Sequence, residues 1–275
     1  MNITDIYNSS FTAHFIQVEN CEPNHALFRG DGFYFWRADE YHVVGPFSSL
    51  AIADDFRANR CLNTVTLVAL TSNHIEGALK AITKCCSGLQ FRKVLFMTDA
   101  PEPDNMAELK QLLRQPFQWI AAPAINDVFD YGNNVVFELP KHIDTGHALI
   151  CHHDGYVVNP QSWTHDFLAY DYVGAPWPVG LPYRVGNGGF CLRSHKLLQA
   201  VMKHEQEFRA ILDARTHYED YALCGGAGRP ILEAEGCVWP SVELAAQFAH
   251  ETPCPETVNS RSLPFGVHGP AYSLA

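Results

Sequence analysis

The sequence predicts an α/β protein in which a central sheet is flanked by helices, preceded by a small β-rich extension. From residue 63 onward, apolar runs typical of buried strands alternate with segments of helical periodicity. Small polar side chains follow the first two of these strands, where open α/β sheets bind ligands. Residues 1–61 instead combine aromatic runs with turn residues and show no helical period. We therefore expect an extension over residues 1–61 and one larger domain over residues 62–275.

Within the extension, Asp31-Gly32 followed by the aromatic run of residues 33–36 indicates a hairpin strand. In the larger domain, residues 64–70 and 93–98 are predicted strands, and residues 75–85 a helix between them. Thr71 and Asp99 follow these strands, and a nucleotide is the natural ligand for such positions.

The second half of the chain continues the alternation of helices and strands. A short apolar strand over residues 148–151 runs directly into His-His-Asp-Gly, and a Pro/Gly-rich loop ends at Arg184. Ser194 is the expected N-cap of a helix that follows a glycine-rich turn. The predicted helices here cover residues 130–143, 163–170, 194–214 and a segment beginning at Glu219.

Composition excludes some classes of protein and sets an expected location. The net charge of −11 and the lack of a Lys/Arg cluster argue against nucleic-acid binding. Nine cysteines without CxxC spacing indicate reduced thiols. No stretch approaches the roughly 20 apolar residues of a membrane span, and the N-terminus lacks signal-peptide features. We expect a cytoplasmic protein without a transmembrane segment.

Asp154 is the first candidate for chemistry, because a carboxylate at the end of a buried strand can hold Mg²⁺ or Mn²⁺ against a diphosphate. On its own, Asp154-Gly155 is more often a strand-ending turn. His268, between glycines near the C-terminus, can fold back to join a carboxylate on a metal, although a lone histidine is more often structural.

The run Gly186-Asn-Gly-Gly-Phe190 lets the backbone approach a polar ligand closely, and Asn187 can bond to hydroxyls. It does not fit the dinucleotide fingerprint, and a plain glycine-rich turn is the alternative. Glu219-Asp220 can divide the labour of general-base catalysis, or simply favour a helix N-terminus. Four aromatic residues could stack on a base or sugar, but more often fill cores: Trp163, Trp177, Tyr183 and Trp239.

The order of these segments is more specific than any one of them. It runs from Asp154-Gly through a Tyr-Asp-Tyr-Val-Gly-Ala-Pro-Trp segment ending at Trp177, a Val-Gly-Asn-Gly-Gly-Phe-Cys-Leu-Arg-Ser segment ending at Ser194, and Glu219-Asp220, to Phe-Gly-Val-His-Gly around His268. This order resembles an uncharacterised bacterial family of glycosyltransferase-like domains over residues 63–269, which is similar to GT-A glycosyltransferases with a Rossmann-like nucleotide-binding half.

The resemblance implies transfer of a sugar from a nucleoside-diphosphate sugar, with a UDP-sugar expected, to a hydroxyl of a glycan or lipid-linked acceptor. It implies metal ligation by Asp154 and His268, with Mn²⁺ or Mg²⁺, and catalysis with inversion by Asp220 beside Glu219. Donor and acceptor would lie near the following residues: Thr71, Asp99, Trp177, Asn187, Gly188, Gly189 and Arg193. A role in bacterial surface polysaccharide assembly would place the protein at the periphery of the inner membrane.

One departure from the family pattern concerns the metal. His152 stands where the first acid of an Asp-x-Asp motif is expected, so the motif keeps a single carboxylate. The alternatives are a metal on Asp154 and His268, or a metal-independent enzyme that uses Arg184 or Arg193 on the leaving group.

Two other functions remain open. A zinc-dependent hydrolase would use Cys151, His152, His153 and His268, although Cys151, His152 and His153 alternate faces on a strand. A noncatalytic glycan-binding module would explain the missing acid.

Overall fold

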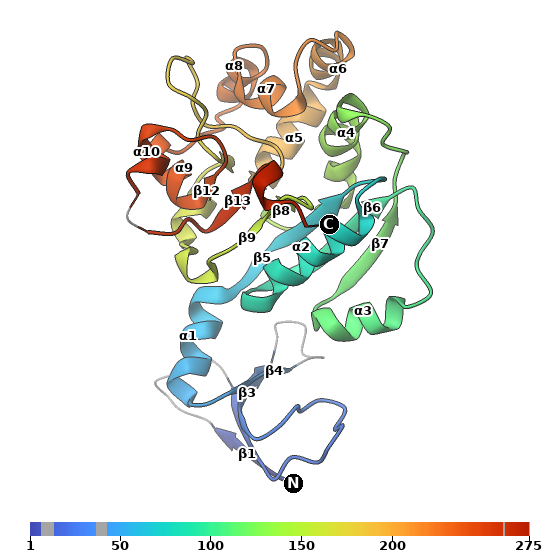
Figure 1. The fold of residues 1–275 in the computed structure, drawn as a ribbon, viewed down its shortest axis with the longest axis vertical. Helices are drawn as coiled ribbons and strands as arrows, with labels where there is room; N and C mark the ends of the chain where they lie inside the picture. Colours follow the sequence, from blue (N-terminus) through green and yellow to red (C-terminus); the bar gives the residue numbers. More distant parts are fainter. Residues whose placement is uncertain (7–13, 37–42, 261, 275) are drawn as a thin grey trace. The chain divides into compact units, whose positions relative to one another are not determined.

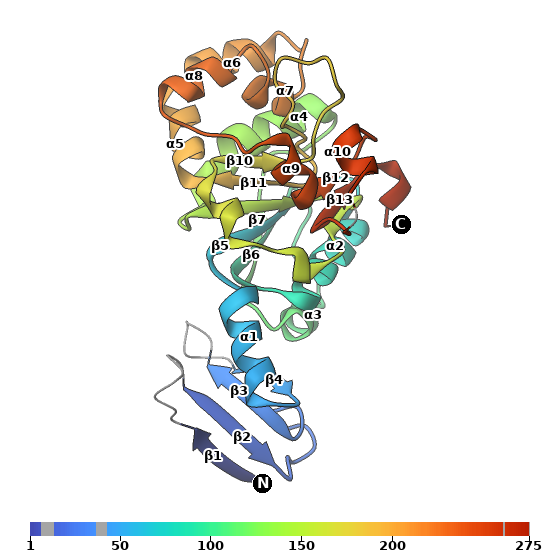
Figure 2. The same cartoon turned by 90° about the vertical axis from the view of Figure 1, so that its left-hand side faces the viewer.

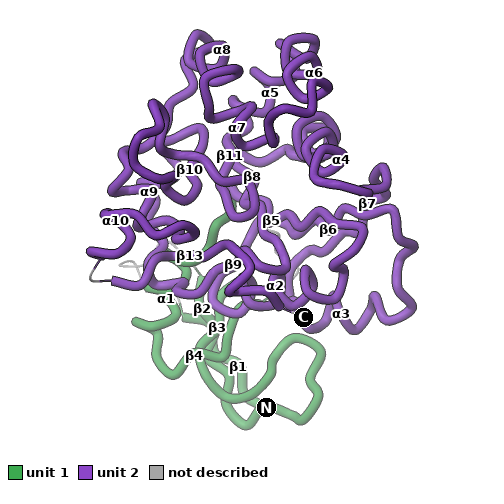
Figure 3. The backbone as a smooth tube through the Cα atoms, turned by 45° about the horizontal axis from the view of Figure 1, so that its top comes forward, with its two compact units in different colours: residues 1–63 green, residues 64–275 purple. Residues whose placement is uncertain are grey.

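The computed structural model describes residues 1–6, 14–36, 43–260 and 262–274, which form two compact units, Met1–Asn63 and Thr64–Ala275 (Figure 3). Unit 1 is an antiparallel sheet of four strands in sequence order, with one helix packed on it (Figure 2). Its elements are β1 (Asn2–Ile6), β2 (Phe15–Glu19), β3 (Gly32–Trp36), β4 (Val43–Phe47) and α1 (Leu50–Arg60). The predicted β-rich extension is therefore confirmed, and its aromatic run lies in β3.

Helix α1 was not expected from the sequence. It begins after Ser49, whose hydroxyl accepts a hydrogen bond of 3.3 Å from the amide of Ile52. Its buried residue Ala53 packs in a cluster with Phe15 and Phe35 of the sheet. The helix thus covers the apolar face that a small sheet alone would leave in water.

Unit 2 is built on a six-stranded sheet in the order β10-β11-β8-β5-β6-β7 (Figure 1). Strand β5 pairs parallel with β8, and β6 pairs parallel with β7, whereas β11 pairs antiparallel with both β8 and β10. The strands are β5 (Cys61–Leu70), β6 (Gln90–Thr98), β7 (Phe117–Ala121), β8 (His147–Cys151), β10 (Tyr172–Gly174) and β11 (Cys191–Ser194). The predicted α/β class with a central sheet is confirmed.

The strand order places a topological switch point between β5 and β8. From β5 the chain builds outward through β6 and β7, then returns to add β8 on the other side of β5. In open α/β sheets, ligands bind in the crevice outside the carboxyl ends of the strands at this point. The residues after Leu70 and after Cys151 are therefore where a ligand is expected.

Alternate side chains of the strands pack on opposite faces of the sheet. Val68 and Ile150 lie in a core cluster with Val135 and Leu197, which belong to the segments after α4 (Val128–Asn133) and within α5 (His195–Lys203). On the face turned toward the viewer in Figure 1, α2 (Ile75–Gly88) buries Ala81, Ile82 and Cys85.

A second, three-stranded sheet lies next to this switch point. It has the order β12-β13-β9, formed by β12 (Ala249–His250), β13 (Gly266–His268) and β9 (Gly155–Val157). The remaining helices are α3 (Met106–Leu113), α6 (Glu205–Asp213), α7 (Glu219–Cys224), α8 (Arg229–Ala234), α9 (Val242–Phe248) and α10 (Pro255–Val258). Within the described parts of the chain, no helix is long and apolar enough to cross a membrane.

Three predicted helices differ from those observed. The helix expected from Ser194 onward begins there, with the Ser194 hydroxyl accepting from the amide of Leu197 at 3.0 Å, but it divides into α5 and α6 at His204. The His204 ring bonds to Glu235 at 2.9 Å, which anchors the break. The helix expected over residues 130–143 continues α4 as a π-helical turn and a 3₁₀ turn, and residues 163–170 contain only a 3₁₀ turn, His165–Ala169.

Candidate functional site

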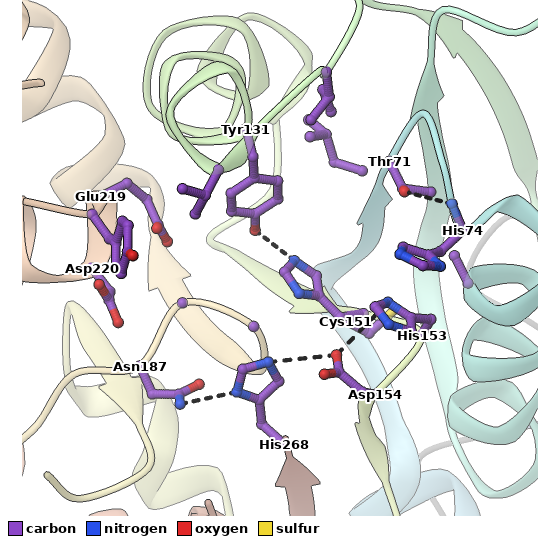
Figure 4. A pocket seen from close by; sticks show the side chains of 18 of the residues that line it. Thr71, His74, Tyr131, Cys151, His153, Asp154, Asn187, Glu219, Asp220 and His268 are labelled. Carbon is purple, nitrogen blue, oxygen red and sulfur yellow. Dashed lines mark hydrogen bonds and ion pairs between the residues drawn. The ribbon is translucent and has the colours of Figure 1, made fainter. Parts of the chain in front are cut away.

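A cavity of about 520 Å³ opens at the carboxyl ends of β5 and β8, at the switch point of the sheet. That volume lies in the usual range for small-molecule sites. Figure 4 shows side chains from β5, the β8–β9 turn, α4, α7 and β13 converging on it. The cavity brings together eight of the residues proposed from the sequence: Thr71, Asp154, Asn187, Gly188, Gly189, Glu219, Asp220 and His268.

Three of the side chains form a cluster that can hold a metal ion. His152, Asp154 and His268 each offer one ligand atom, and these atoms lie within 4.8 Å of one another. Oδ1 of Asp154 is 3.5 Å from Nε2 of His268. Two ligands about 2.1 Å from a shared ion lie about 3.0–3.4 Å apart at octahedral or tetrahedral angles, so this spacing needs little adjustment.

The backbone fixes this cluster. The amide of His152 donates to the carbonyl of Gly155 at 2.8 Å, and the reverse bond is 3.1 Å, which closes a tight turn between β8 and β9. Strand β13 pairs antiparallel with β9 and sets His268 directly opposite Gly155. The amide of Gly269 also donates to the carbonyl of Asp154 at 3.0 Å. Residues far apart in the sequence are thus held together by strand pairing.

Asp154 offers an acceptor that the protein leaves without a donor. Its Oδ1 is buried and has no hydrogen-bond partner. Buried polar atoms are normally bonded, so an unbonded carboxylate oxygen beside two imidazoles has a ready explanation as a cation ligand. The residues therefore fit a divalent metal.

Glu251 orients His268, because a ring nitrogen that donates to Glu251 cannot also accept from the Asn187 amide. Nδ1 of His268 lies 3.0 Å from Oε1 of Glu251 and 3.0 Å from Nδ2 of Asn187. When Nδ1–H donates to Glu251, Nε2 keeps its lone pair toward Asp154, the arrangement of a metal-ligating histidine. Burial would lower the pKa of His268, but the hydrogen bond with Glu251 and the nearby carboxylates raise it above its ordinary value.

His152 is held by Tyr131 of α4. A hydrogen bond of 2.7 Å joins His152 Nε2 to the Tyr131 hydroxyl, and the two rings meet edge to face. Burial first, and then the neighbouring His268 and His153, lower the pKa of His152 well below its ordinary value. His152 is therefore a neutral imidazole, the form that can bind a metal.

The glycine run makes room for the functional side chains. A Cβ at Gly188 would collide with Oε1 of Glu219, and a Cβ at Gly189 would collide with Nε2 of His268. Asn187 adopts a left-handed backbone conformation, with a φ of 72°. Glycine is thus required at residues 188 and 189 because two acid–base groups occupy the space of a side chain.

A buried ion pair supports one wall of the cavity. Arg193 is fully buried, and its Nη2 donates to Oε1 of Glu219 at 2.9 Å, while Glu219 is only 4% exposed. Glu219 and Asp220 stand in the first turn of α7, where the helix dipole favours acids. The pair fixes the start of α7 against β11.

Asp220 has a strongly perturbed carboxyl group. Burial first, and then the charge of Glu219, raise its pKa from 3.8 to about 7, although it accepts a hydrogen bond of 2.7 Å from the amide of Tyr221. A pKa near neutrality suits a group that exchanges protons with a substrate.

The described residues lining the cavity carry acids and histidines but no Lys or Arg. The acids are Asp127, Asp154, Glu219, Asp220 and Glu251, and the imidazoles are His74, His152, His153 and His268. Arg184 instead pairs with Glu256 through two bonds of 2.8 Å. The acids of the lining therefore favour an anionic ligand that enters together with a cation.

Three residues proposed from the sequence do not line the cavity. Asp99 is exposed beyond β6, and Arg193 lies behind Glu219. Trp177 packs its ring on the backbone of Gly186 and stacks with Tyr221 at 5.9 Å between centroids. Their proposed contacts with donor or acceptor stay predictions.

Three residues that line the cavity were not predicted from the sequence: Tyr131, Glu251 and His74. Tyr131 lies in a helix that precedes β8 in the chain, which is the one feature of the sequence that could have indicated it. The residues around it do not distinguish it from a tyrosine of the core. Glu251 reaches His268 because β12 and β13 pair side by side, a pairing with no short-range signature. His74 stacks on His153 with a centroid distance of 4.0 Å.

A family model described as "Protein of unknown function (DUF5672)" matches residues 139–268, a segment that includes Asp154, Asp220 and His268. No curated protein matches the chain.

Three solved structures are similar in part. The apo form of the glycosyltransferase GlyE from Streptococcus pneumoniae TIGR4 has 12% identity over 74% of this chain and 54% of its own, with a TM-score of 0.47. Mouse xyloside xylosyltransferase 1 has 10% identity over 77% of this chain and 99% of its own, with a TM-score of 0.45. The mannosyltransferase PcManGT from Pyrobaculum calidifontis, in complex with GDP-Man and Mn²⁺, has 12% identity over 50% of this chain and 46% of its own, with a TM-score of 0.35. The chain thus spans only about half of the GlyE and PcManGT chains.

Proposed function

We propose that the chain is a glycosyltransferase that transfers a sugar from a nucleoside-diphosphate sugar to a hydroxyl of a glycan or lipid-linked acceptor. The observation that carries this proposal is the convergence of two groups in one cavity at the switch point of the sheet. One group is the cluster of Asp154 and His268 with His152, and the other is the acidic pair of Glu219 and Asp220. The ordered sequence segments that resemble GT-A glycosyltransferases supply the residues of both.

The donor would bind across the loops after β5 and β8, with Thr71 and Asn73 at the end of β5 and Asp154 at the end of β8. A divalent ion, Mn²⁺ or Mg²⁺, held by Asp154 and His268 would neutralise the diphosphate leaving group. A cation is needed there because five acids line the cavity and no Lys or Arg does among the described residues. This balance disfavours the metal-independent alternative that used Arg184 or Arg193.

Asp220 would remove the proton from the acceptor hydroxyl. With a pKa of about 7, the carboxylate is basic enough to accept that proton. About half of it is still ionised at neutral pH. Glu219 is fixed by Arg193 and keeps negative charge beside Asp220, which raises the basicity of Asp220. Direct attack by the acceptor opposite the leaving group would invert the anomeric centre.

The backbone at Gly188 and Gly189 lies between the two groups of residues, since one glycine faces Glu219 and the other His268. The transferred sugar would therefore lie beside these two glycines, between the acidic pair and the metal ligands, and an added side chain would displace Glu219 or His268. The UDP form of the donor, the domain limits of residues 62–275 and a cytoplasmic location at the inner membrane remain parts of this proposal.

A thermal-shift screen of UDP- and GDP-sugars with Mn²⁺ and with chelator tests the proposal. A ligand at 100 times its Kd stabilises the native state by about 2.7 kcal/mol. For a chain of this size, that corresponds to a rise in Tm of roughly 5–10 °C. We expect such a rise for at least one nucleotide sugar with Mn²⁺ and not with chelator. No rise with any donor in either condition would contradict the proposal.

A zinc-dependent hydrolase is the second candidate, because two histidines and one carboxylate with an open position also suit a water-activating zinc ion. The ligand set differs from the one expected from the sequence. Cys151 is not among the clustered ligands, and a hydrogen bond with Cys85, together with burial, raises the pKa of its thiol. Zinc near one per chain with no nucleotide-sugar binding would favour the hydrolase. The noncatalytic module loses its main support, because His152 occupies the place of the missing acid in the cluster.

A further inference from the structure

We propose that His152 is the third protein ligand of the metal site and makes that site selective for a first-row transition ion over Mg²⁺. This inference rests on the proposed metal site at Asp154 and His268, and it goes further by assigning the class of ion. The histidine at residue 152, where the family pattern has an acid, would then determine which metal ion the site prefers.

The position of His152 suits a ligand. Its ligand atom lies within 4.8 Å of those of both Asp154 and His268. His152 and Asp154 belong to the same tight turn, which is closed by two backbone bonds between His152 and Gly155. The turn is further tied to the C-terminal segment, where the amide of Leu274 donates to the carbonyl of His153 at 2.8 Å. The backbone that carries the cluster is therefore restrained before any ion arrives.

Tyr131 determines which nitrogen of His152 is available. Nε2 is bonded to the Tyr131 hydroxyl at 2.7 Å, which leaves Nδ1 to coordinate an ion. In the tautomer that can coordinate, Nε2–H donates to the tyrosine oxygen. The Tyr131 ring is buried in the core cluster beneath α4, so its hydroxyl has little freedom to move. Both imidazoles of the cluster thus have an outer partner, Tyr131 for His152 and Glu251 for His268.

The chemistry of the ligand set decides the class of ion. Mg²⁺ prefers six oxygen ligands and loses its waters reluctantly, so a site with one carboxylate and two imidazoles suits it poorly. Imidazole nitrogens bind zinc, iron, copper and nickel well. Mn²⁺ favours oxygen ligands but, as a transition ion, also accepts imidazole nitrogens beside them, which Mg²⁺ does less readily. With an acid at residue 152, the same turn would offer two carboxylates and would suit Mg²⁺.

The neighbouring histidine provides a matched control. His153 follows His152 in the turn but is not one of the three clustered residues, and its Nδ1 lies 3.8 Å from Oδ1 of Asp154, farther than Nε2 of His268 at 3.5 Å. Its ring stacks on His74 with a centroid distance of 4.0 Å and an interplanar angle of 15°. His153→Asn therefore removes one imidazole from the same turn without removing a proposed ligand.

The experiment uses the full chain without nucleotide sugar. Mn²⁺ binding is measured by electron paramagnetic resonance with Mg²⁺ as competitor, and pulsed spectra count the nitrogens bound to Mn²⁺. We expect wild type to show two imidazole nitrogens and to prefer Mn²⁺ strongly. His152→Asp should show one nitrogen and lose at least about tenfold of the preference for Mn²⁺ over Mg²⁺. Tyr131→Phe should weaken Mn²⁺ binding by about 10- to 100-fold.

His153→Asn should leave the nitrogen count and the preference unchanged. The inference is overturned if wild type binds no metal, binds Mg²⁺ as tightly as Mn²⁺, or keeps two nitrogens in His152→Asp. A change in the nitrogen count of His153→Asn would overturn it equally. If these results hold while no nucleotide sugar binds, the glycosyltransferase proposal fails and the metal assignment stands.

Discussion

Nε2 of His268 lies 3.5 Å from the buried Oδ1 of Asp154, and the backbone of Gly189 closes the space behind the imidazole. Strand β13 brings His268 to this point by pairing with β9 immediately after the turn that carries Asp154. The candidate metal-binding cluster is thus formed by the small three-stranded sheet, and its geometry depends on the absence of a side chain at Gly189.

Gly189→Ala should displace His268 and weaken metal binding. The added Cβ would collide with the imidazole ring, which is itself held by Glu251, so the ring cannot move without losing that bond. We expect Mn²⁺ affinity to fall by at least about tenfold, as for loss of an outer partner. Gly226→Ala is the control, because a Cβ there meets nothing within 4 Å. Equal Mn²⁺ affinity in both variants, measured by calorimetry, would show that Gly189 does not support His268.

Asp220→Asn should separate donor binding from transfer. The amide has nearly the shape of the carboxylate but cannot accept the proton of the acceptor hydroxyl. Removal of a positioned base typically costs about 10²- to 10⁴-fold, and we expect a loss of at least that size in kcat. Donor Kd should change little, because the metal cluster is intact. Turnover close to wild type would remove Asp220 from the mechanism.

The pH dependence of transfer should report the ionisation of Asp220. Its pKa is raised to about 7, so the base is protonated and inactive below that pH. At saturating metal, kcat should rise about tenfold per pH unit on the acid side and level off above about pH 7. A rate that does not change between about pH 5.5 and pH 8 would contradict this assignment.

The raised pKa of Asp220 should also make the protein less stable as pH rises, whereas it makes the enzyme more active. The folded pKa of Asp220 lies above its unfolded value of 3.8, so the folded state holds the proton more tightly between pH 3.8 and about 7. Ionisation of Asp220 should therefore reduce the free energy of unfolding as pH rises through this window. Comparison of Asp220→Asn with wild type by urea unfolding isolates the contribution, since the variant cannot ionise there.

Arg193→Met should destabilise the fold even though Arg193 does not reach the cavity. It would leave the carboxylate of Glu219 buried without its partner, which typically costs about 3–5 kcal/mol. The double variant Arg193→Met/Glu219→Gln should recover much of that loss, because no buried charge remains. Urea midpoints that are equal for the single and double variants would argue that the ion pair does not support α7.

Local patterns in the sequence predict much of the fold. The apolar run that forms β5 and the helical spacing of α2 require only neighbouring residues, and both were predicted. The acids of α7 lie in its first turn, as the helix dipole favours. The division at His204 and the helix α1 were not predicted, because bonds to Glu235 and packing on Phe35 decide them.

The candidate site was predicted less completely, for a physical reason. Asp154, Asp220 and His268 belong to recognisable segments, whereas Glu251 and Tyr131 act through strand pairing and helix packing that join distant parts of the chain. In the sequence pattern, His152 replaces an acidic metal ligand. The pattern alone does not show that the His152 ring reaches the cluster.

Calorimetric titration of a nucleotide sugar into the chain, with Mn²⁺ and with chelator, tests whether a metal at Asp154 and His268 holds the diphosphate of the donor. The donor is the one found in the thermal-shift screen, and the proteins are wild type, Asp154→Ala and Asp220→Asn. We expect wild type and Asp220→Asn to bind the donor equally with Mn²⁺, and wild type to lose binding with chelator. Asp154→Ala should bind weakly in both conditions. Donor binding that is unaffected by chelator and by Asp154→Ala would contradict a metal-held diphosphate at this site.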